Sequence, residues 1–335
     1  MPNITVTDEA HWLSLRESHI GGSEIAALFN GWLLPDGERV VLHAYEPVPE
    51  GAVLLGSCSP YTNAYAVWLA KTGKLIPEWT SSERMDAGTY LEPAIAQWAM
   101  KKWEWKLRKV RRYHSHDQIS GWGCSVDFEV HGGGMEPVEI KNIDYLIARD
   151  NWVIEGDEVI RTPLHITLQL QHYIGARRSE AGWVVACVGG NELVRGRFER
   201  HDATILRIAE AIAAFWQGVR EGVPPVGSAD FDTVKEQFAM GDTSPTVQPA
   251  DLKGDDEAAM LARRFTRLKK HAEFVDVIQS SVKARLALKL GEKPKALGDG
   301  FRVSWPVIER EEKMIPARLQ SAKVYRGGFT VTLAK

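Results

Sequence analysis

The sequence predicts a mixed α/β fold in which helices flank a central sheet. Apolar, strand-like runs are bounded by glycine-rich turns, and stretches with helical periodicity lie between them. The predicted strands are residues 121–130, 138–140, 182–188 and 193–199, and the predicted helices are residues 86–101, 162–175 and 203–220. With 335 residues and 44% apolar content, the chain can bury one sizeable core and still carry an appendage.

The predicted hairpin at residues 121–140 carries the first candidate site residues. Asp127 lies on its first strand, and Glu139 and Lys141 lie on the second. Because strand side chains alternate, Glu139 and Lys141 share a face, while Ile140 points to the opposite, buried face. Two carboxylates about 4 Å apart repel by roughly 4 kcal/mol at an intermediate dielectric, so we expect a cation between them. Oxygen ligands suit magnesium, and manganese would substitute for it.

Both flanking helices carry a polar residue that could join this site. Glu92 lies in the first half of the helix at 86–101, and Gln169 shares a face with His172 in the helix at 162–175. An acid near a helix start also complements the helix dipole, and a buried glutamine often bonds backbone groups. A Glu-x-Lys triplet is likewise common on a solvated strand face. The residues alone therefore leave structural roles open.

The N-terminal stretch WLSLRESHIGGSEIAAL, residues 12–28, contains a candidate anion site. Arg16 and Ser23 are seven positions apart, and Ser23 follows two glycines at the start of an apolar helix. Free backbone N–H groups and the helix dipole could meet a phosphate there. The alternative is that Ser23 is an ordinary N-cap.

Taken in order, these motifs resemble the YqaJ-like viral recombinase and phage lambda exonuclease family of the PD-(D/E)xK nucleases. The matching positions are Glu92, Asp127, Glu139-x-Lys141 and Gln169. Residues 12–28 are similar to the family's opening motif, and SPYTNAYAVWLAKTG at 59–73 is similar to its next segment. The resemblance implies a restriction-endonuclease-like core.

The resemblance also implies how a metal would be held. Asp127 and Glu139 would bind magnesium directly, the backbone carbonyl of Ile140 would be a third ligand, and Glu92 would act through a metal-bound water. Because all these acids are present, a non-catalytic DNA-end-binding protein is the less favoured alternative.

The remaining roles follow from the same match. Lys141 would position the nucleophile, Gln169 would support Lys141 or the metal-bound water, and Arg16 and Ser23 would hold a DNA phosphate. The implied activity is a 5′ to 3′ double-strand DNA exonuclease of phage-type recombination, which exposes 3′ single strands. A PD-(D/E)xK endonuclease is the second alternative. The implied partners are duplex DNA ends, a single-strand annealing protein and further copies of the chain in a homotrimer.

Composition limits the expected cofactors and cellular location but does not identify a function. The net charge is −3, so a DNA-binding surface must be local, and KKWEWKLRKVRR at residues 101–112 is the candidate. Cys58, Cys124 and Cys187 form no CxxC pair, so we expect neither zinc nor an iron–sulfur cluster. No membrane-spanning run or signal sequence is evident, so the expected location is the cytoplasm of a bacterium or phage-infected host.

Three regions are predicted along the chain. Residues 1–225 would form the nuclease domain, with an insertion at 31–56, and residues 226–254 would form a linker. Residues 255–335 would form an accessory region with a long helix, whose apolar residues recur at spacings of three and four, and a small strand pair from 301–305 and 329–333. This region is either a structural brace or a contact for another subunit or partner.

Overall fold

A computed structural model of the chain describes residues 3–74, 82–132, 134, 136–238, 250–299 and 301–305. It contains two compact units, Met1–Gln237 and Phe238–Lys335. The first unit holds every candidate site residue. The domain limits predicted at 225 and 254 stay predictions.

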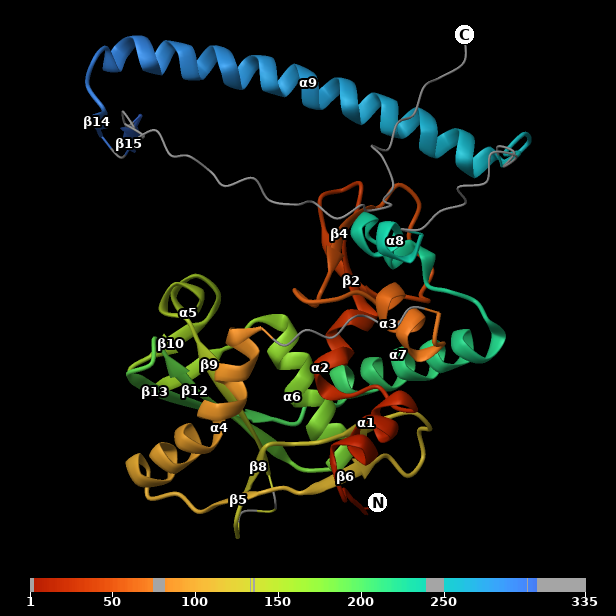
Figure 1. Cartoon of the computed structure of the whole chain (residues 1–335), viewed down its shortest axis with the longest axis vertical. Coiled ribbons are helices and arrows are strands. Elements are labelled where there is room, and N and C mark those ends of the chain that lie inside the picture. Colours follow the sequence, from red (N-terminus) through yellow and green to blue (C-terminus); the bar gives the residue numbers. More distant parts are fainter. Residues whose placement is uncertain are drawn as a thin grey trace, which may run out of the picture. The chain divides into compact units, whose positions relative to one another are not determined.

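The first unit is built on a seven-stranded sheet in the order β10-β11-β13-β12-β9-β8-β5 (Figure 1). Strands β9 and β12 run parallel, while β8 and β9 form an antiparallel hairpin, so the sheet is mixed as predicted. The strands are β5 (Leu107–Lys109), β8 (Phe128–Val130), β9 (Pro137–Ile143), β10 (Val153–Glu155), β11 (Glu158–Arg161), β12 (Ala181–Val188) and β13 (Glu192–Glu199).

Helices cover both faces of this sheet, as the sequence predicts. Helix α4 (Glu83–Lys102) packs on one face, and α6 (Leu164–Arg177) packs on the other with α7 (Asp202–Glu221) against it. Strand β12 shows the alternation: Val185 joins the apolar cluster under α4, and Val184 joins the cluster under α6. Because β12 is buried on both faces, its sequence is a continuous apolar run.

Two smaller sheets and several short helices complete the first unit. One sheet contains β1 (Asn3–Thr5), β6 (Arg112–Ser115) and β7 (Gly123–Cys124), and the other contains β2 (Phe29–Leu33), β3 (Arg39–His43) and β4 (Val53–Ser57). The second sheet occupies the predicted insertion. The remaining helices are α1 (Glu9–Glu17), α2 (Gly22–Ile25), a 3₁₀ turn at Ala26–Leu28, α3 (Ala64–Lys71), α5 (Tyr145–Asn151), a 3₁₀ turn at Val226–Ser228 and α8 (Phe231–Gln237).

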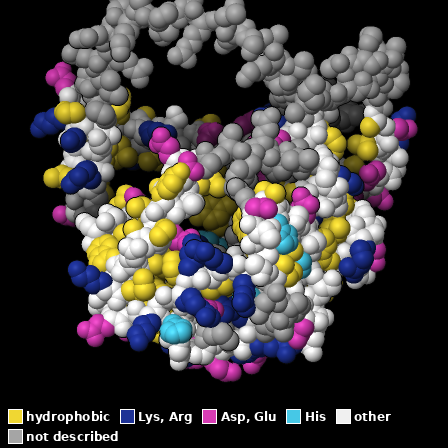
Figure 2. All heavy atoms as spheres, turned by 60° about the horizontal axis from the view of Figure 1, so that its bottom comes forward, with side chains coloured by type: hydrophobic (Ala, Val, Ile, Leu, Met, Phe, Trp, Pro, Cys, Tyr) yellow, Lys and Arg dark blue, Asp and Glu magenta, His cyan; other side chains and the backbone are white. Residues whose placement is uncertain are grey.

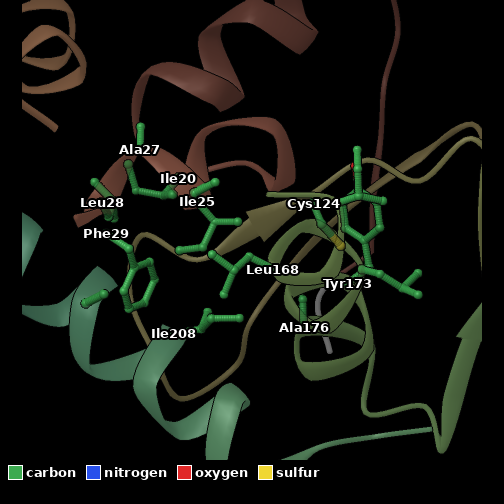
Figure 3. Close-up of a cluster of buried hydrophobic side chains, with 14 of the residues drawn as sticks. Ile20, Ile25, Ala27, Leu28, Phe29, Cys124, Leu168, Tyr173, Ala176 and Ile208 are labelled. Carbon is green, nitrogen blue, oxygen red and sulfur yellow. The ribbon is translucent and has the colours of Figure 1, made fainter. Parts of the chain in front are cut away.

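An apolar cluster fixes α2 against α6 and α7 (Figure 3). Ile25 and Phe29 pack with Leu168 of α6 and Ile208 of α7. A Cβ atom on Gly22 would lie 2.3 Å from the Tyr173 ring, so glycine is what permits this close approach. The N-cap of α2 is Gly21, which corrects the reading of the nearby serine as an ordinary N-cap.

The second unit contains a 35-residue helix, α9 (Asp256–Leu290), followed by a strand pair. The pair joins β14 (Lys295–Gly298) to β15 (Phe301–Ser304) in antiparallel register. The sequence predicted the second of these strands but paired it with residues 329–333, which lie outside the described residues. Across the part of the chain that the structure describes, no helix combines the length and apolarity needed to cross a bilayer.

Candidate active site

The two predicted carboxylates meet where the β8–β9 ladder opens. The last backbone pair of that ladder is Phe128 with Val138. Beyond this pair, the Ile140 N–H has a side-chain acceptor in place of a backbone carbonyl. It donates to Asp127 Oδ2 at 3.0 Å. In an extended strand the N–H and C=O of one residue face the same edge, so the Ile140 carbonyl also faces this opening.

Glu139, Lys141 and Gln169 form a connected polar group beside Asp127. The Lys141 ammonium lies 2.6 Å from Glu139 Oε1 and donates to Gln169 Oε1 at 3.2 Å. Gln169 Nε2 donates to Glu139 Oε1 and to the Tyr173 hydroxyl, each at 2.8 Å. Glu139 and Lys141 thus share one strand face and Ile140 is buried on the other, as predicted. The structure also brings Gln169 to them, as the family resemblance implied.

The electrostatics of this group favour a bound cation. Burial raises the pKa of Asp127 well above its usual range, and the Glu139 and Glu92 carboxylates raise it further. Burial lowers the pKa of Lys141, but Glu139 and Asp127 raise it more, so the ammonium stays charged. Glu139 Oε2 is buried and has no hydrogen-bond partner. A buried carboxylate oxygen without a partner, beside a second carboxyl group, is one that a bound cation would satisfy.

The oxygen donors at this site fit a hard divalent cation. Among the described residues, no three His, Cys, Asp or Glu side chains are grouped to hold a metal. The expected set has only two such side chains, Asp127 and Glu139, with the Ile140 carbonyl as the third donor. Hard oxygen donors with room for water suit magnesium, which keeps several waters when bound.

Glu92 lies at the edge of the site and not inside it. Its carboxylate is ion-paired with Lys109 of β5, and its charge still contributes to the raised pKa of Asp127. This position suits an indirect role through water, and that role remains a prediction.

Arg16 and Ser23 line the same cavity as the carboxylates. This cavity of about 190 Å³ is bordered by Arg16, Ser23, Asp127, Glu139 and Gln169. The Arg16 guanidinium donates to Ser23 Oγ at 3.3 Å. Arg16 and Asp127 are 111 positions apart along the chain, and the fold brings both to the border of one cavity.

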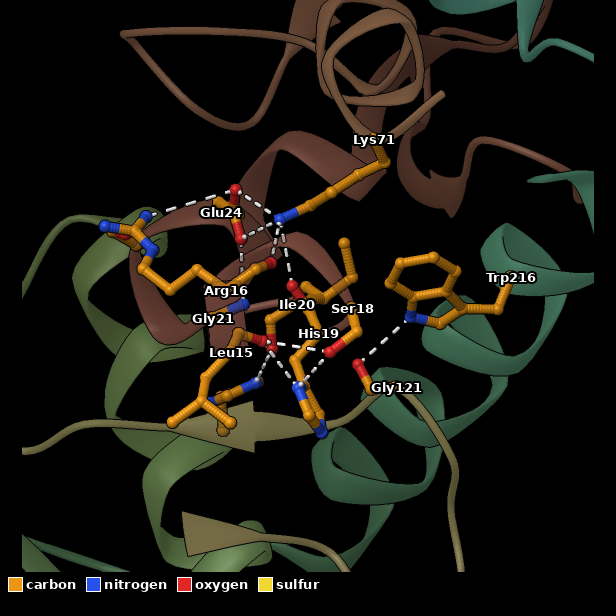
Figure 4. Close-up of polar contacts among 12 residues, drawn as sticks. Leu15, Arg16, Ser18, His19, Ile20, Gly21, Glu24, Lys71, Gly121 and Trp216 are labelled. Carbon is orange, nitrogen blue, oxygen red and sulfur yellow. Dashed lines mark hydrogen bonds and ion pairs between the residues drawn. The ribbon is translucent and has the colours of Figure 1, made fainter. Parts of the chain in front are cut away.

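A buried ion pair holds α1 and α2 in place around Arg16 (Figure 4). Lys71 of α3 donates to the carbonyls of Arg16 and His19, at 2.6 and 2.9 Å, and to both oxygens of Glu24. Glu24 in turn accepts from the Gly21 N–H at 2.9 Å and lies 4.0 Å from the Arg16 guanidinium. The end of the helix that carries Arg16 is thereby tied to the start of the helix that carries Ser23.

Sequence reasoning missed several residues of this site. Tyr113, Ser125 and Tyr173 line the cavity, and Lys71 and Glu24 hold the backbone around Arg16. Tyr173 had one available signal, since it lies four positions after Gln169 on the same helical face. The others are identified only by the folded structure.

The predicted basic stretch is exposed, and its tryptophans pack inward. All seven Lys and Arg side chains of residues 101–112 are exposed, while Trp103 and Trp105 pack against the apolar cluster under α4. Figure 2 shows Lys and Arg side chains gathered below a hollow on one face of the molecule. Some of these charges are already paired, because Arg108 bonds Glu129 and Lys109 bonds Glu92.

Comparison with known proteins adds independent evidence for the family resemblance. Residues 50–176 match the model of the YqaJ-like viral recombinase domain. The uncharacterized protein YqaJ of Bacillus subtilis is 24% identical over 204 residues, which cover 59% of this chain and 61% of that protein. The chain thus matches less than two thirds of that relative's length.

Two solved structures show a weaker likeness. An alkaline exonuclease from Laribacter hongkongensis has 15% identity and a TM-score of 0.45, covering 64% of this chain and 94% of its own. A phage-related exonuclease from Haemophilus somnus has 9% identity and a TM-score of 0.41, covering 61% and 95%. Similarity at this level assigns no residue role.

The family match contains the whole polar group described above. Glu92, Asp127, Glu139, Lys141 and Gln169 all lie within its limits, whereas Arg16 and Ser23 precede it. The match confirms the resemblance inferred from the motifs. Residues 50–176 of this chain are therefore similar to the YqaJ-like viral recombinase domain, over about 38% of the chain.

Proposed function

We propose that this protein is a magnesium-dependent deoxyribonuclease that degrades duplex DNA from its ends, 5′ to 3′, and leaves 3′ single strands. One observation carries the proposal. A single cavity joins two carboxylates, one with an unpartnered buried oxygen, to an arginine–serine pair suited to a phosphate. The first group suits hydrolysis of a phosphodiester, and the second suits recognition of a chain end.

The metal would be held by Asp127, Glu139 and the Ile140 carbonyl, with Glu92 acting through water, and manganese would substitute for magnesium. Bound there, the ion would lower the pKa of a water and stabilise the charge that develops on the phosphate. Asp127 would then be ionised, because the charge of a bound cation offsets both the burial and the carboxylate repulsion that raise its pKa.

Lys141 and Gln169 would orient the attacking water. The Lys141 ammonium is fixed between Glu139 Oε1 and Gln169 Oε1, so its charge is held beside the carboxylates. The Gln169 amide is itself fixed by Tyr173, whose pKa burial raises well above its usual range, so the phenol stays protonated. A preorganised ammonium can stabilise charge on the phosphate without reorganising during the reaction.

Arg16 and Ser23 would make the reaction depend on a DNA end. A guanidinium and a hydroxyl can both donate to a terminal phosphate, whose charge exceeds that of a backbone phosphate. Anchoring the terminal 5′-phosphate there would place the next phosphodiester toward the carboxylates of the same cavity. This geometry supports release of mononucleotides.

A single incubation tests the activity and its alternatives. The purified chain with magnesium should digest linear duplex labelled at the 5′ end to labelled mononucleotides and should leave closed circular duplex intact. Cutting of circular duplex would indicate an endonuclease. Retention of linear DNA in a gel without any cleavage would indicate a non-catalytic end-binding protein. Release from the 3′ end first would refute the proposed direction.

The assembly is also a proposal. Helix α9 exposes apolar side chains at Leu261, Leu268, Val275 and Val282, which suits contact with another protein surface. A homotrimer and a single-strand annealing partner are the assemblies that the family resemblance implies. Light scattering after size-exclusion chromatography would give the subunit number directly.

A further inference from the structure

A second and larger cavity adjoins the first. It has a volume of about 740 Å³ and shares Ser23 and Gln169 with the cavity described above. Arg16 borders only the first cavity, whereas Lys141 borders only the second. A strand whose terminal phosphate is held by Arg16 would therefore continue past Lys141 into this second space.

Two aromatic side chains, Tyr61 and His165, line the second cavity. Tyr61 is 83% exposed, and its ring centroid lies 5.9 Å from that of His165 with the rings at 89°. This edge-to-face contact leaves aromatic surface free for a flat ligand. Burial lowers the pKa of His165 and the Lys141 charge lowers it further, so the imidazole is neutral near pH 7 and contributes a ring and no charge.

The charges that line the two cavities differ. Among the described residues bordering the second cavity are two cations, Arg84 and Lys141, and no carboxylate. The first cavity contains Asp127 and Glu139. A polyanionic strand therefore meets less repulsion in the second cavity once it has passed the reacting phosphate.

The rest of the lining suits a base. Ile147 and Trp152 supply apolar surface, and the amides of Asn142 and Asn151 supply groups that can both donate and accept. Amide groups of this kind do not select one base edge, which suits a surface that must accept each base in turn. Sequence-tolerant binding of single strands commonly relies on stacking against aromatic side chains.

We propose that this second cavity is a nucleobase site, in which the base of the nucleotide directly after the scissile phosphate stacks on Tyr61 beside His165. The inference rests on the proposed function, because the substrate is the same DNA strand. Tyr61 is a positioning residue: it holds the strand so that the phosphodiester before that base lies at the carboxylates.

Three variants of the full chain test the role of Tyr61. Tyr61→Leu should lower kcat/KM on linear 5′-phosphorylated duplex by about 5- to 150-fold, mainly by raising KM, because stacking on the phenol is lost. Tyr61→Phe keeps an aromatic face and should stay near the wild-type value. Tyr90→Leu is the matched control, since Tyr90 is 81% exposed on α4 and borders neither cavity.

An altered substrate then shows whether Tyr61 acts on that base. A duplex with an abasic nucleotide directly after the first scissile bond should lower wild-type kcat/KM by the same factor as Tyr61→Leu. The two changes combined should cost no more than either alone. An abasic nucleotide five positions further in is the substrate control and should have little effect on the first cleavage.

The outcomes separate this inference from the proposed function. If the wild type digests DNA but Tyr61→Leu matches it, or if the losses from variant and abasic substrate multiply, the base site is wrong and the nuclease stands. If the wild type digests no DNA with magnesium, the proposed function fails and the base site fails with it.

Discussion

The buried Lys71–Glu24 pair gives the sharpest prediction about the proposed phosphate site at Arg16 and Ser23. Its side chains are only 6% and 19% exposed, and Lys71 also binds two backbone carbonyls. Lys71→Met removes one partner of a buried pair, which typically costs about 3–5 kcal/mol of unfolding free energy. Domains are stable by about 5–15 kcal/mol, so the variant should still fold but with a lower urea midpoint.

The same change should weaken phosphate binding. Without Lys71, the cation nearest to Glu24 is Arg16, 4.0 Å away. Two charges at about 4 Å attract by roughly 4 kcal/mol in a medium of intermediate dielectric, so Glu24 would compete with the phosphate for Arg16. We expect the preference for 5′-phosphorylated over 5′-hydroxyl ends to fall by about tenfold, which corresponds to roughly 1.4 kcal/mol.

A double variant separates charge competition from damage to the fold. In Lys71→Met/Glu24→Gln the competing charge is gone, so the phosphate preference should recover even though the native pair is missing. Lys74→Met is the matched control, because Lys74 is exposed and its ammonium lies 4.2 Å from the Trp68 ring centroid, not at Glu24. Initial rates on the two kinds of end, with urea unfolding monitored in parallel, give both quantities. A double variant that discriminates no better than Lys71→Met would refute the competition.

Three further predictions concern the sheet and the metal site. Asp127→Asn should stabilise the metal-free protein at neutral pH and abolish cleavage with magnesium. Because the pKa of Asp127 is raised in the folded protein, the wild type loses stability as the pH rises through that pKa. A melting series from pH 5 to 8 should show that the variant lacks this loss. Glu129→Gln should lower the free energy of unfolding in urea by about 3–5 kcal/mol, because it leaves the buried Arg177 without its charged partner. Burial raises the pKa of Glu129 but its arginine partners lower it more, so the difference between wild type and variant should vanish as acid protonates the wild-type carboxyl. A difference that stays constant with pH would count against the ion pair. Gly22→Ala should push against the Tyr173 ring, which an added Cβ would meet at 2.3 Å, and should lower kcat, whereas Gly88→Ala, with open space around it, should not.

Local sequence patterns predicted much of the fold because short-range physics sets them. Strand-like composition on either side of a glycine-rich loop predicted the β8–β9 hairpin, and helical spacing predicted α4, α6 and α7. The first predicted strand, 121–130, was too long, because the structure divides it between β7 and β8 in two different sheets and leaves Asp127 just before β8. The C-terminal strand pair shows the limit of such patterns. The strand at Phe301–Ser304 was predicted, but its pairing with Lys295–Gly298 was not, since an alternating pattern does not specify which segment supplies the hydrogen-bonding edge. The predicted partner at 329–333 lies outside the described residues.

By itself, the sequence determined which residue types share a strand or helix face, and so that Glu139 and Lys141 would stand together beside a buried Ile140. Only the tertiary structure decided what lies opposite them. The close approach of α2 to Tyr173, the anchoring of Arg16 by Lys71 and Glu24, and the second cavity beside Lys141 all join segments far apart in the chain. Such contacts depend on how whole elements pack, because side-chain volume and buried charge are balanced across the core and not along any one segment.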